Sequence, residues 1–224
     1  MKLFLDTANI DEIREINDWG ILKGVTTNPT LLAREQGDVE KAWRTILELV
    51  DGDVSLETTE PEAQAMYEQG KRFATFAGNV VVKVPMTPAG ITAGKHLTDD
   101  GIRINVTLVF SPAQAILSAE IPAYIVSPFL GRIDDVAADG MHALRQICEI
   151  YEVQGYETQV LAASLRHPMH VVDAALAGAD IATMPYDVFK KLVKHPLTDK
   201  GLESFDNDWK ALQEELKQQG RKGA

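Results

Sequence analysis

The chain has 224 residues, of which 45% are hydrophobic and 25% charged, so it is long enough for a sizeable core and has the composition of a globular protein. Its formal net charge of -11 and isoelectric point near 4.9 argue against nucleic acid or an anionic membrane as a partner, because both repel an acidic surface. An anionic ligand therefore requires a local basic site.

The start of the chain and its cysteine content bear on where the protein works. Met1 leads directly into LFLD, without the basic start and long apolar core of a signal peptide, and no apolar run approaches the roughly 18 residues of a membrane span. Cys148 is the single cysteine, which excludes an internal disulfide and any all-cysteine metal site. We therefore expect a cytoplasmic protein that does not contact membranes.

Short β-rich runs alternate with helical patterns along the chain. In order, the runs are LFLD, GVTTN, VSLE, VVVKV, INVTL, YIVS, QVLAAS and IATMP. Helical patterns separate them, and residues 134–155 are predicted to form one helix. A repeat of about 20 to 30 residues is typical of βα units whose strands are parallel.

Eight such units predict an α/β fold, a single (β/α)8 TIM barrel over residues 1–224, because eight strands close the sheet and remove both edges. An open doubly wound sheet is the alternative, although no GxGxxG or Walker A pattern follows any run. Residues 198–224 are predicted to form a C-terminal helical tail. Phe205, Trp209 and Leu212 fall on one face of it, which suits packing on the barrel or on a neighbouring subunit.

Polar side chains end seven of the eight β-rich runs. They include Asp6, Thr26, Asn28, Glu57, Lys83, Asn105, Thr107, Ser127 and Ser164. In a barrel the carboxyl ends of the strands meet at one mouth, where barrel enzymes carry their active sites. Asp, Asn and Ser side chains form hydrogen bonds with the nearby backbone in turns, which would explain a polar residue at one strand end. Turn formation does not explain polar residues at seven strand ends. The pattern predicts an active site.

Lys83 lies two positions after Val81, so both side chains share one face of the strand. If that face meets the helices, the lysine stem extends to the surface. If it faces the barrel interior, the amine is desolvated and can attack a carbonyl to form a Schiff base. Asp6 and Glu57 then serve as proton carriers, or they form an ion pair that only neutralises Lys83.

The amides and arginines at the strand ends suggest a polar, anionic ligand. Asn28 fits either an Asx turn or a contact with substrate hydroxyls. Asn105 and Thr107 point the same way, and inside a barrel they need a polar ligand or an ordered water. Arg132 and Arg166 each follow a strand end, so they predict a phosphate clamp, although either alone is typical of a solvated surface charge.

No motif predicts a metal site. His167 and His170 are three residues apart in a turn that leads from a loop into a helix, and no carboxylate lies at a spacing typical of metal ligands. We therefore predict that the site works without a metal ion.

Six motifs resemble the small, single-domain branch of the transaldolase family, which also contains fructose-6-phosphate aldolases. They are LFLDTAN, GVTTNPTLL, VVVKVPMT, NVTLVFSPAQA, SPFLGRIDD and LAASLRHP. The resemblance runs from Met1 to about Trp209. It implies a class I aldolase-type (β/α)8 barrel without a metal or an organic cofactor.

The resemblance also implies roles for individual residues. Lys83 matches the family's Schiff-base lysine and Asp6 its proton-transfer aspartate, while Glu57 and Thr107 match the pair that holds the catalytic water. The residues predicted to bind substrate are Thr26, Asn28, Asn105, Ser127 and Phe129. The phosphate-binding group matches Arg132, Ser164 and Arg166.

The implied reaction belongs to the pentose phosphate pathway. It moves a dihydroxyacetone unit from sedoheptulose 7-phosphate or fructose 6-phosphate to glyceraldehyde 3-phosphate or erythrose 4-phosphate. Two positions distinguish aldolases from transaldolases within the family. The resemblance implies that aldolase members carry glutamine where this chain has Glu57 and tyrosine where it has Phe129, so both positions favour a transaldolase. The alternatives are an aldolase, a transaldolase for another C6-substituted ketose, and a non-enzymatic sugar-phosphate binder.

The resemblance also implies a homo-pentamer or homo-decamer, in which the C-terminal helix of each subunit reaches a neighbouring subunit. That arrangement implies a role for the tail that begins near Phe205. The effect of Thr58, which follows Glu57, is not predicted by the sequence.

Overall fold

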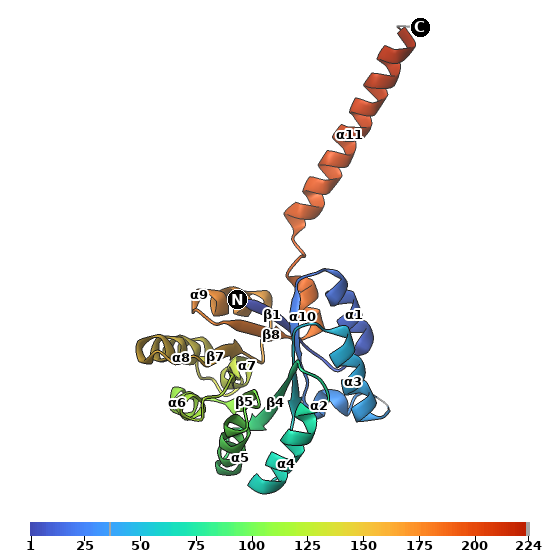
Figure 1. The fold of residues 1–224 in the computed structure, drawn as a ribbon. Helices are drawn as coiled ribbons and strands as arrows, with labels where there is room; N and C mark the ends of the chain where they lie inside the picture. Colours follow the sequence, from blue (N-terminus) through green and yellow to red (C-terminus); the bar gives the residue numbers. More distant parts are fainter. Residues whose placement is uncertain (36, 223–224) are drawn as a thin grey trace. The chain divides into compact units, whose positions relative to one another are not determined.

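The computed structural model describes residues 1–35 and 37–222. Within Met1–Phe189, helices surround a central ring of strands (Figure 1). The strands are β1 (Lys2–Asp6), β2 (Leu22–Thr26), β3 (Asp53–Glu57), β4 (Val80–Pro85), β5 (Ile104–Val109), β6 (Ile125–Pro128), β7 (Gln159–Ala162) and β8 (Ile181–Met184). The helices are α1 (Ile10–Asp18), α2 (Pro29–Leu32), α3 (Val39–Leu49), α4 (Ala63–Ala74), α5 (Pro88–Asp99), α6 (Pro112–Glu120), α7 (Leu130–Asp134), α8 (Gly140–Gln154), α9 (Pro168–Leu176), α10 (Tyr186–Lys191) and α11 (Pro196–Lys222).

The strands form a closed parallel barrel in chain order, because β8 pairs with β1 as well as with β7. The eight β-rich runs correspond to these strands, so the predicted (β/α)8 barrel is confirmed and the open sheet is wrong. The register of the strand pairs also determines which strand-end residues lie side by side. Asp6 lies opposite Thr26, and Lys83 lies between Glu57 and Asn105.

The chain divides into two compact units, Met1–Phe189 and Lys190–Ala224. The first contains the whole barrel. The second consists mainly of α11, a C-terminal helix that begins two residues before the predicted tail. No helix in the described part of the chain is both long and apolar enough to cross a lipid bilayer.

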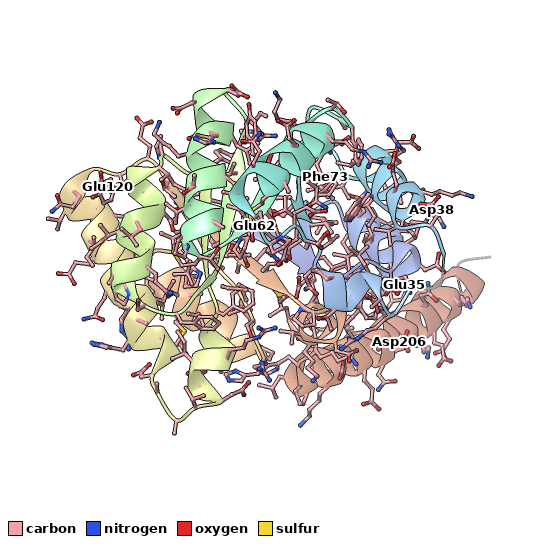
Figure 2. All side chains as sticks on the ribbon, turned by 90° about the horizontal axis from the view of Figure 1, so that it is seen from below. Glu35, Asp38, Glu62, Phe73, Glu120 and Asp206 are labelled. Atoms are coloured by element: carbon pink, nitrogen blue, oxygen red, sulfur yellow. The ribbon has the colours of Figure 1, made fainter. Side chains whose placement is uncertain are left out.

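The outside of the barrel unit is polar and its axis is apolar. Glu62 and Glu120, at the ends of α4 and α6, lie on the outer surface (Figure 2). An apolar interior layer fills the barrel and consists of Phe4, Val81, Ile125, Leu161 and Ile181. Successive side chains of a strand alternate between faces, so each of these residues points the same way as the one two positions later. The inward-facing residues at the strand ends therefore lie next to this apolar layer.

Gly24 is required by this layer. A Cβ atom at Gly24 would lie 2.4 Å from the ring of Phe4 and 2.5 Å from the backbone carbonyl oxygen of Asp53. Neither neighbour is free to move, because Phe4 is fully buried and Asp53 begins β3. The absence of a side chain at Gly24 therefore lets β2 lie beside the largest residue of the layer.

We expect Gly24→Ala to lower the free energy of unfolding by about 2 kcal/mol through overpacking. For a chain of this length, that loss corresponds to a melting temperature lower by roughly 4–8 °C. Gly78→Ala is the matched control, since a Cβ atom there meets nothing within 4 Å. Thermal unfolding of both variants checks the prediction, and equal melting temperatures would contradict it.

The prediction of one helix over residues 134–155 is wrong. The structure places α7 up to Asp134 and begins α8 at Gly140. Asp139 is the N-cap of α8 and accepts a hydrogen bond from the backbone N–H of His142. Ala137 in the connection is left-handed, with φ of 60°. The capping aspartate thus starts a new helix where the apolar pattern alone suggests a continuous one.

Candidate active site

A pocket opens at the carboxyl ends of the strands. Its lining consists of Asp6, Thr26, Asn28, Lys83, Ser127, Phe129, Arg132, Leu161, Ala163, Ser164 and Thr183. Most of the residues predicted from the sequence thus meet at one place. Glu57, Asn105 and Thr107 lie on the neighbouring strand ends, and Arg166 lies apart from the lining.

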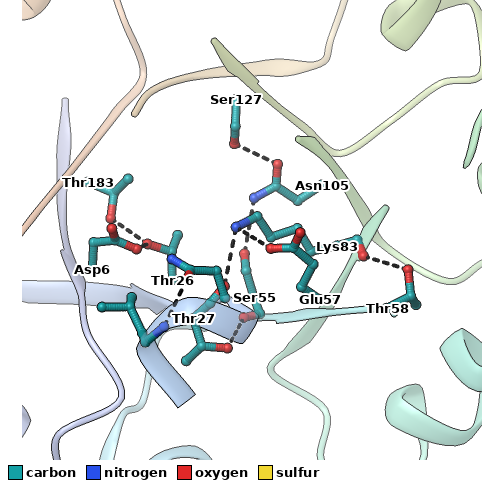
Figure 3. A network of polar contacts seen from close by, with 12 residues as sticks. Asp6, Thr26, Thr27, Ser55, Glu57, Thr58, Lys83, Asn105, Ser127 and Thr183 are labelled. Atoms are coloured by element: carbon teal, nitrogen blue, oxygen red, sulfur yellow. Dashed lines mark hydrogen bonds and ion pairs between the residues drawn. The ribbon is translucent and has the colours of Figure 1, made fainter. Parts of the chain in front are cut away.

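Lys83 points into the barrel and is only 4% exposed, so the interpretation of a stem extended to the helix surface is wrong. Its Nζ atom lies 2.9 Å from Glu57 Oε2 and donates to the Thr27 carbonyl oxygen at 3.2 Å (Figure 3). The predicted ion pair is therefore present as a contact. At this distance it is also a direct path for a proton between the amine and the carboxylate.

Thr58 holds the backbone beside this pair. Its hydroxyl donates to the Lys83 carbonyl oxygen at 3.1 Å, and its backbone N–H donates to the same oxygen at 2.9 Å. Both bonds join the end of β3 to β4. They fix the strand positions from which Glu57 and Lys83 project.

Asp6 belongs to a chain of hydroxyl contacts on the opposite strands. Thr26 Oγ1 donates to Asp6 Oδ1 at 2.7 Å, and the hydroxyls of Thr26 and Thr183 lie 2.7 Å apart (Figure 3). Since Thr26 has one proton and gives it to Asp6, Thr183 is the donor in the second contact. Burial raises the pKa of Asp6 above 3.8, against the opposing effects of the Lys83 charge and the Thr26 hydrogen bond. The raised pKa makes the carboxyl a better proton acceptor than an ordinary aspartate, which suits a group that takes up and returns a proton.

A second chain runs between β3, β5 and β6. Ser127 Oγ donates to Asn105 Oδ1 at 2.7 Å, and Asn105 Nδ2 donates to Ser55 Oγ at 3.1 Å. Thr107 is fully buried, and its hydroxyl has no hydrogen-bond partner among the described residues. A buried hydroxyl without a partner calls for a water molecule or a ligand. This observation supports the water-holding role predicted for Thr107.

The side-chain oxygen of Asn28 is occupied by a hydrogen bond to the nearby backbone. Its Oδ1 accepts a hydrogen bond from the Leu31 N–H at 3.0 Å and caps α2. This bond reaches three residues along the chain, so it is a helix N-cap rather than the Asx turn that the sequence suggested as the local alternative. The Nδ2 end is the part of this pocket-lining side chain that a substrate hydroxyl can use.

The basic side of the pocket lies at α7. The Arg132 guanidinium lies 5.0 Å from the ring centroid of Phe129, and Phe129 packs edge-on against Phe110. The backbone N–H of Gly131 donates to the Ser164 carbonyl oxygen at 3.1 Å. Ser164 is held in a left-handed conformation, with φ of 59°. Arg132 and Ser164 thus face the pocket from adjacent segments.

Arg166 does not line the pocket in the described structure. Its Nη2 atom lies 2.6 Å from Asp135 Oδ2, and its side chain is 49% exposed. The predicted pair of arginines therefore places one guanidinium, that of Arg132, in the pocket. A phosphate contact by Arg166 stays a prediction.

Two residues of these networks were missed by sequence reasoning. Thr183 lines the pocket, and Ser55 anchors the second chain. Each is a small hydroxyl residue inside an apolar run, which is common in strands. The signal that could have found them is spacing, since Ser55 lies two positions before Glu57 and Thr183 two positions after Ile181.

The comparisons with known proteins agree with this geometry. The family model described as "Transaldolase/Fructose-6-phosphate aldolase" matches residues 3–220. The chain belongs to this family.

Three relatives illustrate the similarity. A "Probable transaldolase" of Roseiflexus castenholzii is 53% identical over 96% of this chain and 99% of its own length. A "Probable transaldolase 1" of Bacillus cereus is 56% identical over 96% of this chain and all of its own. A "Probable transaldolase" of Desulfosudis oleivorans is 52% identical over 94% and 98% of the two chains.

A solved structure supports the fold alone. Thiamine phosphate pyrophosphorylase from Pyrococcus furiosus superposes with a TM-score of 0.58 at 16% sequence identity, covering 85% of this chain and 93% of its own. At that identity the match supports a barrel and carries no functional argument.

Proposed function

We propose that this enzyme is a transaldolase of the pentose phosphate pathway, acting in the cytoplasm on sugar phosphates by Schiff-base catalysis. It transfers a dihydroxyacetone unit from sedoheptulose 7-phosphate or fructose 6-phosphate to glyceraldehyde 3-phosphate or erythrose 4-phosphate. The observation that carries the proposal is the buried amine of Lys83, 2.9 Å from Glu57 in a pocket that also contains Asp6 and Arg132. The names of the relatives support it.

The first step forms the covalent intermediate. Lys83 Nζ passes a proton to Glu57 and attacks the ketone carbon of the donor, which gives a carbinolamine. Glu57 returns the proton to the carbinolamine hydroxyl, and water leaves as the imine forms. The unpartnered hydroxyl of Thr107 is placed to hold that water.

The second step breaks the carbon–carbon bond. The Asp6 carboxylate takes the proton of the C4 hydroxyl, the C3–C4 bond breaks, and its electron pair moves into the protonated imine to give an enamine. The first aldose phosphate leaves with its phosphate released from Arg132 and Ser164.

The third step reverses the chemistry on a new aldehyde. The enamine carbon attacks the acceptor aldehyde, and its oxygen takes the proton back from Asp6. Water then adds to the imine with help from Glu57, the carbon–nitrogen bond breaks, and the free amine of Lys83 is restored.

Phe129 favours transfer over release of free dihydroxyacetone. It lines the pocket with an apolar ring and has no hydroxyl to position water or to protonate the enamine. We expect the wild-type enzyme to turn over fructose 6-phosphate only when an acceptor aldehyde is present. We expect Phe129→Tyr to raise acceptor-independent release of dihydroxyacetone at least tenfold, because the phenol supplies the missing proton donor.

Coupled assays of dihydroxyacetone with and without erythrose 4-phosphate check this prediction. Phe110→Tyr is the matched control, since Phe110 contacts Phe129 but does not line the pocket. Equal release with and without acceptor in the wild type would favour the aldolase alternative. Binding of fructose 6-phosphate without any turnover would favour the sugar-phosphate binder.

We further propose that α11 is the assembly element of a homo-pentamer or homo-decamer, on a chain that otherwise forms a single barrel domain. Its exposed apolar residues recur at intervals of three and four: Leu202, Phe205, Trp209, Leu212 and Leu216. A helix with such a stripe requires an apolar partner. A second copy of the chain is the partner that the resemblance implies, and a contact between different surfaces of two copies closes into a ring.

We expect Phe205→Glu combined with Trp209→Glu to shift the protein from its native assembly to monomers, because two charges in the stripe prevent its burial. Sedimentation velocity of the full-length variant measures the change. Asp208→Ala is the control, since Asp208 adjoins Trp209 but lies outside the stripe. A wild-type protein that sediments as a monomer would contradict the proposal.

A further inference from the structure

We propose that His170 is a positioning residue for the phosphate side of the pocket. It fixes the segment that carries Ser164 against the helix that carries Arg132. The inference rests on the proposed function, because it treats Arg132 and Ser164 as the groups that hold the substrate phosphate.

His170 bridges two separate elements. It lies on α9 with only 8% exposure, and its Nδ1 atom is 3.2 Å from the backbone nitrogen of Arg166. Its Nε2 atom is 3.3 Å from Asp134 Oδ2. Arg166 lies two residues after Ser164, and Asp134 lies two residues after Arg132. One imidazole thus connects the two segments that supply the basic side of the pocket.

The hydrogen bonds determine the form of the ring. A backbone N–H can only donate, so Nδ1 of His170 is the unprotonated acceptor, and the hydrogen of the neutral ring is on Nε2, the atom 3.3 Å from Asp134 Oδ2. Burial, followed by the nearby His167, lowers the pKa of His170, while Asp134 and Asp173 oppose that effect. The neutral ring that the contact with the Arg166 N–H requires is therefore the form present near neutral pH.

Other links also join these segments, including hydrogen bonds from the Leu130 N–H to the Ala163 carbonyl oxygen and from the Ala163 N–H to the Pro128 carbonyl oxygen, both at 3.0 Å. The Gly131 N–H donates to the Ser164 carbonyl oxygen, and Arg166 pairs with Asp135 in a contact that is about half exposed on both sides. Exposed pairs of this kind contribute little. Ser164 also holds a left-handed backbone, which is strained for a non-glycine residue and persists only when its surroundings enforce it. His170 adds a buried side-chain contact just after Ser164, at the backbone N–H of Arg166.

Lys83 is outside this arrangement. It lies on β4, whereas His170 and its two partners lie on α7, on α9 and in the segment after β7. Loss of the bridge should therefore weaken phosphate binding and leave the chemistry at the amine unchanged.

We expect His170→Ala to raise KM for fructose 6-phosphate about tenfold while kcat changes less than about twofold, a loss of binding that is equal in ground and transition states. KM for fructose, the same donor without phosphate, should stay unchanged. His170→Asn should recover part of the loss, because Asn Oδ1 occupies the place of Nδ1 and accepts from the Arg166 N–H. His142→Ala is the control, since that histidine is exposed on α8.

Calorimetric titration of each variant with inorganic phosphate gives a second readout that needs no turnover. Weaker phosphate binding by His170→Ala than by wild type and His170→Asn supports the inference even if the enzyme proves not to be a transaldolase. Equal KM changes for fructose 6-phosphate and fructose, or an Asn variant no better than Ala, would overturn it. If the Ala variant does not fold, the Asn variant compared with His170→Gln decides, because Gln lacks an acceptor at the Nδ1 position.

Discussion

Replacement of Lys83 by alanine is expected to lower kcat by about 10⁴-fold or more, because no other amine lines the pocket among the described residues. Borohydride reduction in the presence of fructose 6-phosphate should attach a three-carbon unit to Lys83 of the wild-type enzyme. Mass spectrometry of proteolytic fragments locates that adduct. The variant should carry none.

The Lys83→Arg variant tests whether activity requires the nucleophilic amine of Lys83 or only its positive charge. Arginine keeps a cation next to Glu57 but stays protonated and forms no imine, so it should be as inactive as alanine. The alanine variant leaves Glu57 without its partner and should also be less stable by a few kcal/mol, whereas arginine should retain more of that stability. An adduct on another lysine, or an active arginine variant, would sink the Schiff-base mechanism.

Asp6→Asn is expected to inactivate the enzyme and stabilise its fold. Loss of the proton carrier should lower kcat about 10²- to 10⁴-fold. Above the folded-state pKa of Asp6 the free energy of unfolding should rise by about 1 kcal/mol, because there the wild-type chain holds a desolvated carboxylate that the amide replaces with a neutral group. The same substitution thus affects function and stability in opposite directions.

The pH dependence follows from the raised pKa. A carboxyl whose pKa is higher in the folded than in the unfolded chain binds its proton more tightly when folded, so wild-type stability falls as pH rises from 3.8 through the folded-state pKa. The advantage of Asp6→Asn should be complete above that interval and disappear below pH 3.8. Thermal melts of both proteins from acid to neutral pH measure it. Asp51→Asn, in an exposed loop, should show no such trend.

Strand periodicity placed Lys83 on the same face as Val81, but it left open whether that face meets the helices or the barrel interior. The structure decides between them, because Val81 belongs to the interior layer. The partner of Lys83 was less predictable, since Asp6 and Glu57 both end strands. The register of β3 against β4 places Glu57 opposite Lys83, and that register is set by barrel closure rather than by any local pattern.

The side of the pocket formed by Arg132 and Ser164 was less predictable from the sequence. Arg132 and Arg166 follow adjacent strand ends, which suggested a joint clamp. The left-handed conformation of Ser164 redirects the chain after β7, and Arg166 pairs with Asp135 instead. A non-glycine residue with positive φ has no dependable sequence signal. The bridge made by His170 depends on that same turn, so it too appears only in three dimensions.

The apolar packing of the described residues inside the barrel leaves the pocket with one opening, which bears on the order in which substrates bind and products leave. Phe4, Val81 and the rest of the apolar layer close the axis beneath Lys83, so in the described structure this pocket is a blind one whose opening lies at the carboxyl ends. Both aldehydes must use that opening. In the proposed mechanism, the first aldehyde therefore departs before the second enters, and the dihydroxyacetone unit stays bound to Lys83 between these two steps. We accordingly expect ping-pong kinetics, to which the packing beneath the site contributes as well as the covalent chemistry.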